Sequence, residues 1–140
     1  MVESFAAGAD AILLIVAALE PGDLGSLHEH AIALGLDALV EVHDQRELSV
    51  AAALGGELIG INNRDLTTLL VDTRRTYELL PSVPTGATVV AESGFSLASE
   101  LDQLELAGVH GVLIGEALMR SPQIEAACRA LTARGVTRVK

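Results

Sequence analysis

One local pattern occurs five times along the chain: a helical stretch or turn, a glycine, a short apolar run and a polar turn. The apolar runs cover residues 11–16, 39–42, 58–61, 88–91 and 111–114. The glycines just ahead of them are Gly8, Gly35, Gly55, Gly86 and Gly108. Successive runs begin roughly 20 to 30 residues apart, the length of one strand plus one crossover helix. The pattern therefore predicts repeated β-α units and a parallel sheet.

The residues available for a core support this interpretation. Half of the chain is hydrophobic, yet its only aromatic residues are Phe5, Tyr77 and Phe95. The core must therefore consist of Leu, Ile, Val and Ala, which suits parallel strands that are covered on both faces. A length of 140 residues is that of one domain, so we expect residues 1–140 to form a single α/β domain.

Polar residues follow four successive apolar runs directly. They are Glu41 and His43, Asn62 to Asp65, Glu92 to Gly94, and Gly115 with Glu116. In a barrel all βα loops meet at one rim, where active sites form. In an open doubly wound sheet such residues would gather mainly at one switch point. The sequence therefore favours a parallel (β/α) barrel of the TIM-barrel kind, present here as a partial barrel of about five β-α units.

Each candidate carboxylate has a structural alternative. Glu41 could be a solvated residue at a strand end, but the alternation that points Leu39 inward also points Glu41 inward. Glu92 could belong to turn chemistry, although a carboxylate that ends an apolar strand is costly to bury without a partner. His43 is interpreted as a loop residue or as a support for a catalytic neighbour. Asp44 followed by Glu47 has the spacing of a capping box.

The amide and cationic candidates are equally open on chemistry alone. Asn62 and Asn63 could simply shape a turn, because Asn tolerates such backbones. Arg64 could form a structural ion pair with Asp65 or bind an anion. Glu116 is expected to point outward into solvent.

The turns at Ser93-Gly94 and Gly115-Glu116 form a more specific pair. Each precedes a helical start, and two such glycine turns after the last two strands predict a phosphate-binding cup.

Charge and motif content exclude several function classes. The net charge of −10 argues against nucleic acid and against an anionic membrane surface as partners. The longest apolar run, 11–19, is too short to span a bilayer. His28 and His30 cannot share one helix face, so no metal site is expected there. No phosphate-loop or dinucleotide fingerprint is present. A single cysteine, Cys128, fits a cytoplasmic location.

Taken together, the strand segments resemble the indole-3-glycerol-phosphate synthases. ADAILLIVAAL (9–19) resembles the fourth strand of that family, LVEVH (39–43) the fifth and IGINNRDL (59–66) the sixth. VAESG (90–94) resembles the seventh and VLIGEALM (112–119) the eighth. The resemblance runs through nearly the whole chain in the order of the family's strands.

The resemblance implies a carbon–carbon lyase of tryptophan biosynthesis that closes an indole ring without a cofactor or a metal. Its substrate would be 1-(2-carboxyphenylamino)-1-deoxyribulose 5-phosphate, a small phosphorylated derivative of anthranilate. The family's catalytic residues correspond to Glu41, Asn62 and Glu92. Glu41 would take part in proton transfer during dehydration, Asn62 would orient the reacting groups, and Glu92 would contact a substrate hydroxyl and the lysines of the active site.

The remaining site residues would bind the substrate. Ser93 would act beside Glu92, and Arg64 is the candidate cation for the anionic substrate. Backbone N–H groups of Gly94, Gly115 and Glu116 would bind the phosphate. Many members of the family have Ser where this chain has Glu116, a change that a backbone donor tolerates.

The chain departs from the family in one serious respect. The family's essential lysines lie on its first and third strands, whereas the only lysine here is Lys140. A complete barrel needs about 250 residues, and five strands cannot close it. We therefore expect this chain alone to have little or no synthase activity, to expose two sheet edges and an apolar inner face, and to need the missing N-terminal barrel segment as a partner. The alternatives are a non-catalytic phosphate-binding half-barrel and another phosphate-binding barrel, such as phosphoribosylanthranilate isomerase or the tryptophan synthase α subunit.

Overall fold

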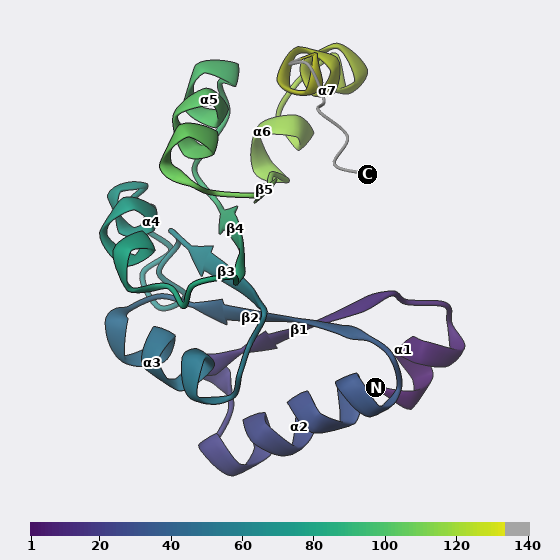
Figure 1. The fold of residues 1–140 in the computed structure, drawn as a ribbon. Coiled ribbons are helices and arrows are strands. Elements are labelled where there is room, and N and C mark those ends of the chain that lie inside the picture. Colours follow the sequence, from purple (N-terminus) through teal and green to yellow (C-terminus); the bar gives the residue numbers. More distant parts are fainter. Residues whose placement is uncertain (134–140) are drawn as a thin grey trace.

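The computed structural model describes residues 1–133, so Lys140 lies outside the described residues. Helices and strands alternate along most of this length (Figure 1). The strands are β1 (Ala11–Ile15), β2 (Asp37–Val42), β3 (Leu58–Asn62), β4 (Thr88–Glu92) and β5 (Gly111–Leu113). The α-helices are α1 (Val2–Ala6), α2 (Pro21–Ala33), α3 (Gln45–Ala53), α4 (Arg74–Leu79), α5 (Ala98–Ala107), α6 (Glu116–Met119) and α7 (Ile124–Thr132). Two 3-10 turns, η1 (Val16–Ala18) and η2 (Leu80–Ser82), complete the set.

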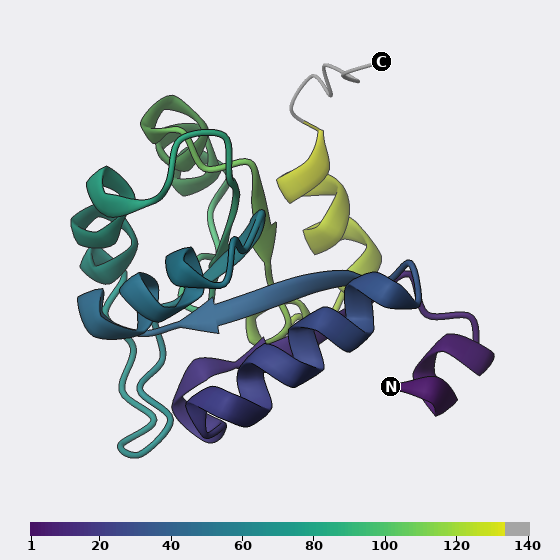
Figure 2. The same ribbon diagram turned by 60° about the horizontal axis from the view of Figure 1, so that its bottom comes forward.

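All five strands form one parallel sheet in the order β1-β2-β3-β4-β5. The predicted partial barrel of parallel β-α units is thereby confirmed. Figures 1 and 2 show the sheet bending, with α2, α3, α4 and α5 following one another around its outside. The predicted strand positions differ from the observed ones by one or two residues. The largest difference is in β2, which begins at Asp37 because that residue pairs with Ala11 of β1.

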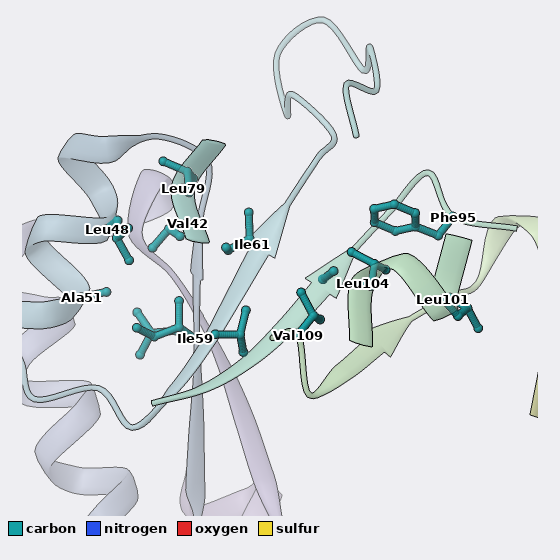
Figure 3. Packing of buried hydrophobic residues seen from close by; sticks show 13 residues of the cluster. Val42, Leu48, Ala51, Ile59, Ile61, Leu79, Phe95, Leu101, Leu104 and Val109 are labelled. Atoms are coloured by element: carbon teal, nitrogen blue, oxygen red, sulfur yellow. The ribbon is translucent and has the colours of Figure 1, made fainter. Parts of the chain in front are cut away.

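The main core lies between the sheet and the outer helices. Val42 of β2 and Ile59 and Ile61 of β3 are fully buried there. Leu48 of α3 and Leu79 of α4 lie on the same side of the sheet as these residues (Figure 3). Burying an aliphatic side chain of this size is worth about 1.5–3 kcal/mol. This layer therefore holds the strands in the register that places the strand ends beside one another.

The other face of the sheet is the inner face of the partial barrel. The strand register puts Leu13, Leu39 and Leu58 in one row across β1, β2 and β3. Leu13 is 49% exposed and Leu113 of β5 is 52% exposed. Within the described residues β1 and β5 each pair with one strand only. The expectation of two open edges and of exposed apolar side chains is therefore met.

Two local signals in the sequence act as predicted. The Asp44 side chain accepts a hydrogen bond of 2.8 Å from the Glu47 N–H and so caps the start of α3. Gly108 ends α5 in the left-handed conformation, with φ of 97°. Among residues 1–133, none of the helices combines the length and the apolar character that crossing a membrane requires.

Candidate active site

Three of the predicted site residues, Glu41, Asn62 and Glu92, lie together on the inner face, at the carboxyl ends of β2, β3 and β4. Asn62 is paired with Glu92 in the register, and Glu41 is paired with Gly60. Their exposures are only 3% for Glu41, 7% for Asn62 and 4% for Glu92. Because charged side chains are seldom buried without a reason, this group of buried polar side chains marks a candidate site.

Gly60 makes room for the Glu92 carboxyl, a role that the sequence reasoning missed. A Cβ atom at position 60 would lie 2.0 Å from Glu92 Oε1 and 3.2 Å from Glu92 Cδ. The Glu92 side chain therefore leans across β3 above Gly60, towards β2 and Glu41. The available signal was a glycine inside a strand, which often marks the close approach of another group.

The proximity of Glu41 changes the protonation of Glu92. Burial first, and then the charge of Glu41 and a hydrogen-bonding contact with it, raises the pKa of Glu92 from 4.5 to about 8. Two carboxyls this close do not both ionise readily, so the pair retains one proton near neutral pH. Among the described residues, three buried side-chain atoms of this region have no hydrogen-bond partner: Glu41 Oε1, Glu92 Oε1 and His43 Nε2. The pair therefore combines a proton donor with a proton acceptor, and one oxygen of each carboxyl is available to accept a hydrogen bond from a ligand.

His43 lies next to this pair and connects it to α3. Its Nε2 is 3.3 Å from Glu41 Oε1, and its Nδ1 is 3.1 Å from Glu47 Oε2. Glu47 Oε2 also accepts a hydrogen bond of 2.7 Å from the His43 N–H. Of the two interpretations of His43, the structure supports contact with a site residue. Sequence reasoning treated Glu47 only as part of a helix cap.

Asn62 and Asn63 have different surroundings although they are neighbours. Asn62 Oδ1 accepts a hydrogen bond of 3.0 Å from the Arg64 N–H, which shapes the chain after β3. Asn63 is fully buried. Its Nδ2 donates to the Glu92 and Ser93 carbonyl oxygens at 3.1 and 3.0 Å. The turn interpretation therefore fits Asn62 in part, whereas Asn63 ties the end of β3 to the end of β4.

The other side of the Asn63 amide holds α4. Asn63 Oδ1 accepts hydrogen bonds from the Thr76 N–H at 3.1 Å and from Thr76 Oγ1 at 2.9 Å. Thr76 is itself fully buried. Sequence reasoning did not assign Asn63 to the site, and its only signal was an amide directly after a buried strand.

The remaining predicted site residues line one hollow beside the carboxyl pair. The hollow has a volume of about 490 Å³, and its lining includes Arg64, Ser93, Gly94, Gly115 and Glu116. Glu41, Asn62 and Glu92 do not line the hollow, but Ser93, which does, directly follows Glu92 in the chain. The structure thus brings together all eight residues proposed from the sequence, in two adjoining groups.

An ion pair crosses this hollow. Arg64 Nη2 donates to Glu116 Oε2, and Arg120 Nη2 lies 2.7 Å from Glu116 Oε1. The Glu116 side chain is 51% exposed, as the sequence predicted, but it also forms two ion pairs that the sequence did not predict. Asp65 accepts hydrogen bonds from the Thr67 and Thr68 N–H groups. Arg64 therefore forms its ion pair with Glu116 and not with Asp65.

The turn after β4 has an unusual backbone. Ser93 has φ of 65° and Gly94 has φ of 92°, a region that favours glycine. A Cβ at position 94 would lie 2.6 Å from Val71 Cγ1 and 2.7 Å from Thr73 Cγ2. Glycine is therefore needed at position 94 for both its backbone and its lack of a side chain.

A curved parallel sheet, helices on its outside and polar side chains at the carboxyl ends of its strands define part of a (β/α) barrel protein. Solved structures support this fold. Thiamine phosphate pyrophosphorylase from Pyrococcus furiosus is similar with a TM-score of 0.71 and 21% identity, over 93% of this chain and 61% of that one. 3-Hexulose-6-phosphate synthase from Salmonella typhimurium is similar with a TM-score of 0.71 and 15% identity, over 92% of this chain and 63% of that one.

Sequence comparison identifies the particular family. The chain belongs to the indole-3-glycerol phosphate synthase family, whose model matches residues 1–131. It is 50% identical over 129 residues to the indole-3-glycerol phosphate synthase of Rhizorhabdus wittichii. The aligned segment covers 92% of this chain and 49% of the relative. It is 47% identical over 131 residues to the indole-3-glycerol phosphate synthase of Azospirillum brasilense. Here the aligned segment covers 94% of this chain and 50% of the relative. The chain therefore spans about half the length of the curated relatives that it matches.

Proposed function

We propose that this chain forms half of an indole-3-glycerol-phosphate synthase active site in the cytoplasm. Joined to the half that it does not span, it would convert 1-(2-carboxyphenylamino)-1-deoxyribulose 5-phosphate to indole-3-glycerol phosphate. A bond forms between the aromatic ring carbon and the ketone carbon, and one molecule of carbon dioxide and one of water leave. The reaction has no net oxidation and needs no cofactor.

The observation that carries this proposal is the buried carboxyl pair, Glu41 and Glu92, in a family whose named relatives are synthases. Dehydration requires a proton to be removed from the substrate and another to be delivered to the departing hydroxyl. Because burial and Glu41 raise the pKa of Glu92 to about 8, Glu92 remains able to donate to that hydroxyl. Glu41 is then the base of the pair, and Asn62 lies beside them to orient the reacting groups.

The hollow next to the pair would receive the phosphate of the substrate. Ser93 and Gly94 border it on one side, and Gly115 and Glu116 on the other. The exposed glycine turns let backbone N–H groups approach an anion closely. Arg64 brings a guanidinium to the same hollow, which suits the planar, bidentate recognition of a phosphate.

The test uses the chain joined to the part of the Rhizorhabdus wittichii relative that lies outside the match, here called the completed chain. We expect the completed chain to form indole-3-glycerol phosphate, followed by product fluorescence, and the chain alone to have little or no activity. Glu41→Gln and Glu92→Gln should each lower kcat by about 10²-fold or more. If the completed chain were inert while the intact relative turned over under the same conditions, the proposal would be wrong.

A phosphate-binding half-barrel without catalysis is the second candidate, favoured by two arginines, Arg64 and Arg120, and two glycine turns that line one hollow. It would bind inorganic phosphate as tightly in Glu92→Gln as in the unchanged chain. Turnover by the completed chain separates the two candidates, because only the synthase proposal requires it.

A further inference from the structure

The turn after β4 has a backbone conformation that Ser93 does not favour by itself. Ser93 has φ of 65°, in the left-handed region, where a residue with a Cβ atom is uncommon. Such a conformation persists where the surrounding structure fixes it, and it is found most often at functional sites. Ser93 and Gly94 also line the hollow that is proposed to receive the phosphate. The groups that hold Ser93 in this conformation therefore also shape the hollow.

The side chain of Asn63 holds this turn from the end of the neighbouring strand. Its Nδ2 donates to the Glu92 carbonyl oxygen at 3.1 Å and to the Ser93 carbonyl oxygen at 3.0 Å. These carbonyl groups belong to the peptide units on either side of the Ser93 Cα, so the orientation of both units is fixed. In a trans peptide the N–H points away from the C=O, so the N–H groups of Ser93 and Gly94 point away from Asn63. Neither N–H donates to a backbone carbonyl of residues 1–133, which leaves both available to a ligand.

Asn63 is itself held by α4 and by the segment that precedes this helix. Its Oδ1 accepts hydrogen bonds from the Thr76 N–H at 3.1 Å and from Thr76 Oγ1 at 2.9 Å, and both residues are fully buried. The Asn63 carbonyl oxygen accepts a hydrogen bond of 3.0 Å from the Asp72 N–H. An amide that donates to β4 and accepts from α4 fits in one orientation only. The turn is therefore anchored to α4 through a single side chain.

We propose that Asn63 is a positioning residue for substrate binding, which holds the peptide units on both sides of Ser93 so that the Ser93 and Gly94 N–H groups stay available to a phosphate in the hollow. This inference rests on the proposed function for the identity of the phosphate-bearing substrate. Asn63 would not touch that substrate, because it is fully buried and its amide is already bonded on both sides.

The first test measures phosphate binding by the chain itself. Inorganic phosphate is titrated and followed by amide NMR, whose spectra also show whether each variant is folded. We expect Asn63→Ala to weaken the affinity by about tenfold or more, because the Ser93 and Gly94 N–H groups lose their fixed orientation. Leu24→Ala is the control, since it removes a buried side chain from a separate core cluster under α2 and lowers stability without touching the turn. Equal affinities in the two variants would overturn the inference.

Thr76→Val tests the same connection with a smaller loss of stability. It removes the Oγ1 donor to Asn63 but keeps the shape of the side chain and the hydrogen bond from the Thr76 N–H. We expect the affinity for inorganic phosphate to fall by about twofold to fourfold, with shifts in the Ser93 and Gly94 amide signals. Thr132→Val is the matched control, because the Thr132 hydroxyl donates to the Cys128 carbonyl oxygen on α7 instead. If the two valine variants bind phosphate equally and leave both amide signals in place, Asn63 does not position the turn.

The reaction of the completed chain separates positioning from a general loss of structure. A variant that is only less stable has fewer folded molecules, which lowers the apparent kcat and leaves KM unchanged. We expect Asn63→Ala instead to raise KM by about tenfold, and Leu24→Ala to leave KM unchanged. An unchanged KM in Asn63→Ala contradicts this inference alone. A completed wild-type chain without turnover contradicts the proposed function, and the phosphate titration then decides the role of Asn63 by itself.

Discussion

A methyl group on Gly60 would lie 2.0 Å from Oε1 of Glu92. The middle strand of the sheet thus lacks a side chain where the carboxyl of its neighbour needs space. Gly60 is also paired with Glu41, so the same gap lets the two carboxyls approach each other across β3. The acid-base character of the site therefore depends on a residue that has no functional group.

Gly60→Ala should displace the Glu92 carboxyl with only a modest loss of stability, about 1–2 kcal/mol, because the atom in the way is the end of a flexible side chain. In the completed chain we expect kcat to fall by about 10²-fold, as the base and the proton donor lose their alignment. Gly111→Ala is the control, since its Cβ would make an ordinary contact of 3.7 Å with Val90. Equal activity in the two variants would show that the space over Gly60 does not matter.

Glu92 should make folding stability depend on pH. Its pKa is raised from 4.5 to about 8 by burial and by Glu41, so between these values the folded chain keeps a proton that the unfolded chain has lost. Stability should therefore fall as the pH rises from about 4.5 to about 8, by an amount on the order of a few kcal/mol, and then level off.

Glu92→Gln removes this contribution because glutamine stays neutral in both states. Denaturant unfolding at both ends of the range should show the variant gaining stability relative to the wild type at the alkaline end only. A difference between the two proteins that is the same at both ends would contradict the assignment.

Asn63→Ala should destabilise the chain by about 2–4 kcal/mol, because it leaves buried partners on β4 and α4 without hydrogen bonds. Asn62→Ala removes one side-chain hydrogen bond, to the Arg64 N–H, and should cost less than about 1 kcal/mol. Activity of the completed chain should be affected by both. Thermal unfolding of the two variants measures this difference in stability. Equal melting temperatures would contradict the prediction.

The sequence predicted the parallel sheet and the rim of polar residues because both follow from local patterns. Strand ends are visible where an apolar run meets Glu41 or Glu92, and parallel pairing then brings those ends together. The positions of Gly60 and Asn63 in the site were not predictable in this way. Their importance arises from which side chain of a neighbouring strand lies over them, and that depends on strand register and curvature.

The ion pair at Glu116 was missed for a related reason. Arg64 and Glu116 are 52 residues apart, and no local pattern distinguishes their contact from a pair with the adjacent Asp65. The contact of Glu47 with His43 was also missed, because the capping box with Asp44 already explains a glutamate at position 47.

Glu116 competes with any phosphate that enters the hollow. Its carboxylate takes Arg64 and Arg120 and adds a negative charge to the place where a phosphate would lie. Glu116→Ser should therefore free both guanidinium groups and remove the repulsion, while leaving the backbone N–H in place. We expect its affinity for inorganic phosphate to rise about threefold to tenfold at low salt, and the gain to shrink as salt is added.

The matched control is Glu125→Ser, which breaks a similar pair with Arg129 one turn further along α7 and removes the same charge away from the hollow. Titration of inorganic phosphate, followed by amide NMR, compares the two variants at several salt concentrations. If Glu116→Ser binds phosphate no better than Glu125→Ser, the carboxylate is not a competitor, and Arg64 is a structural partner of Glu116 instead of a group held ready for an anion.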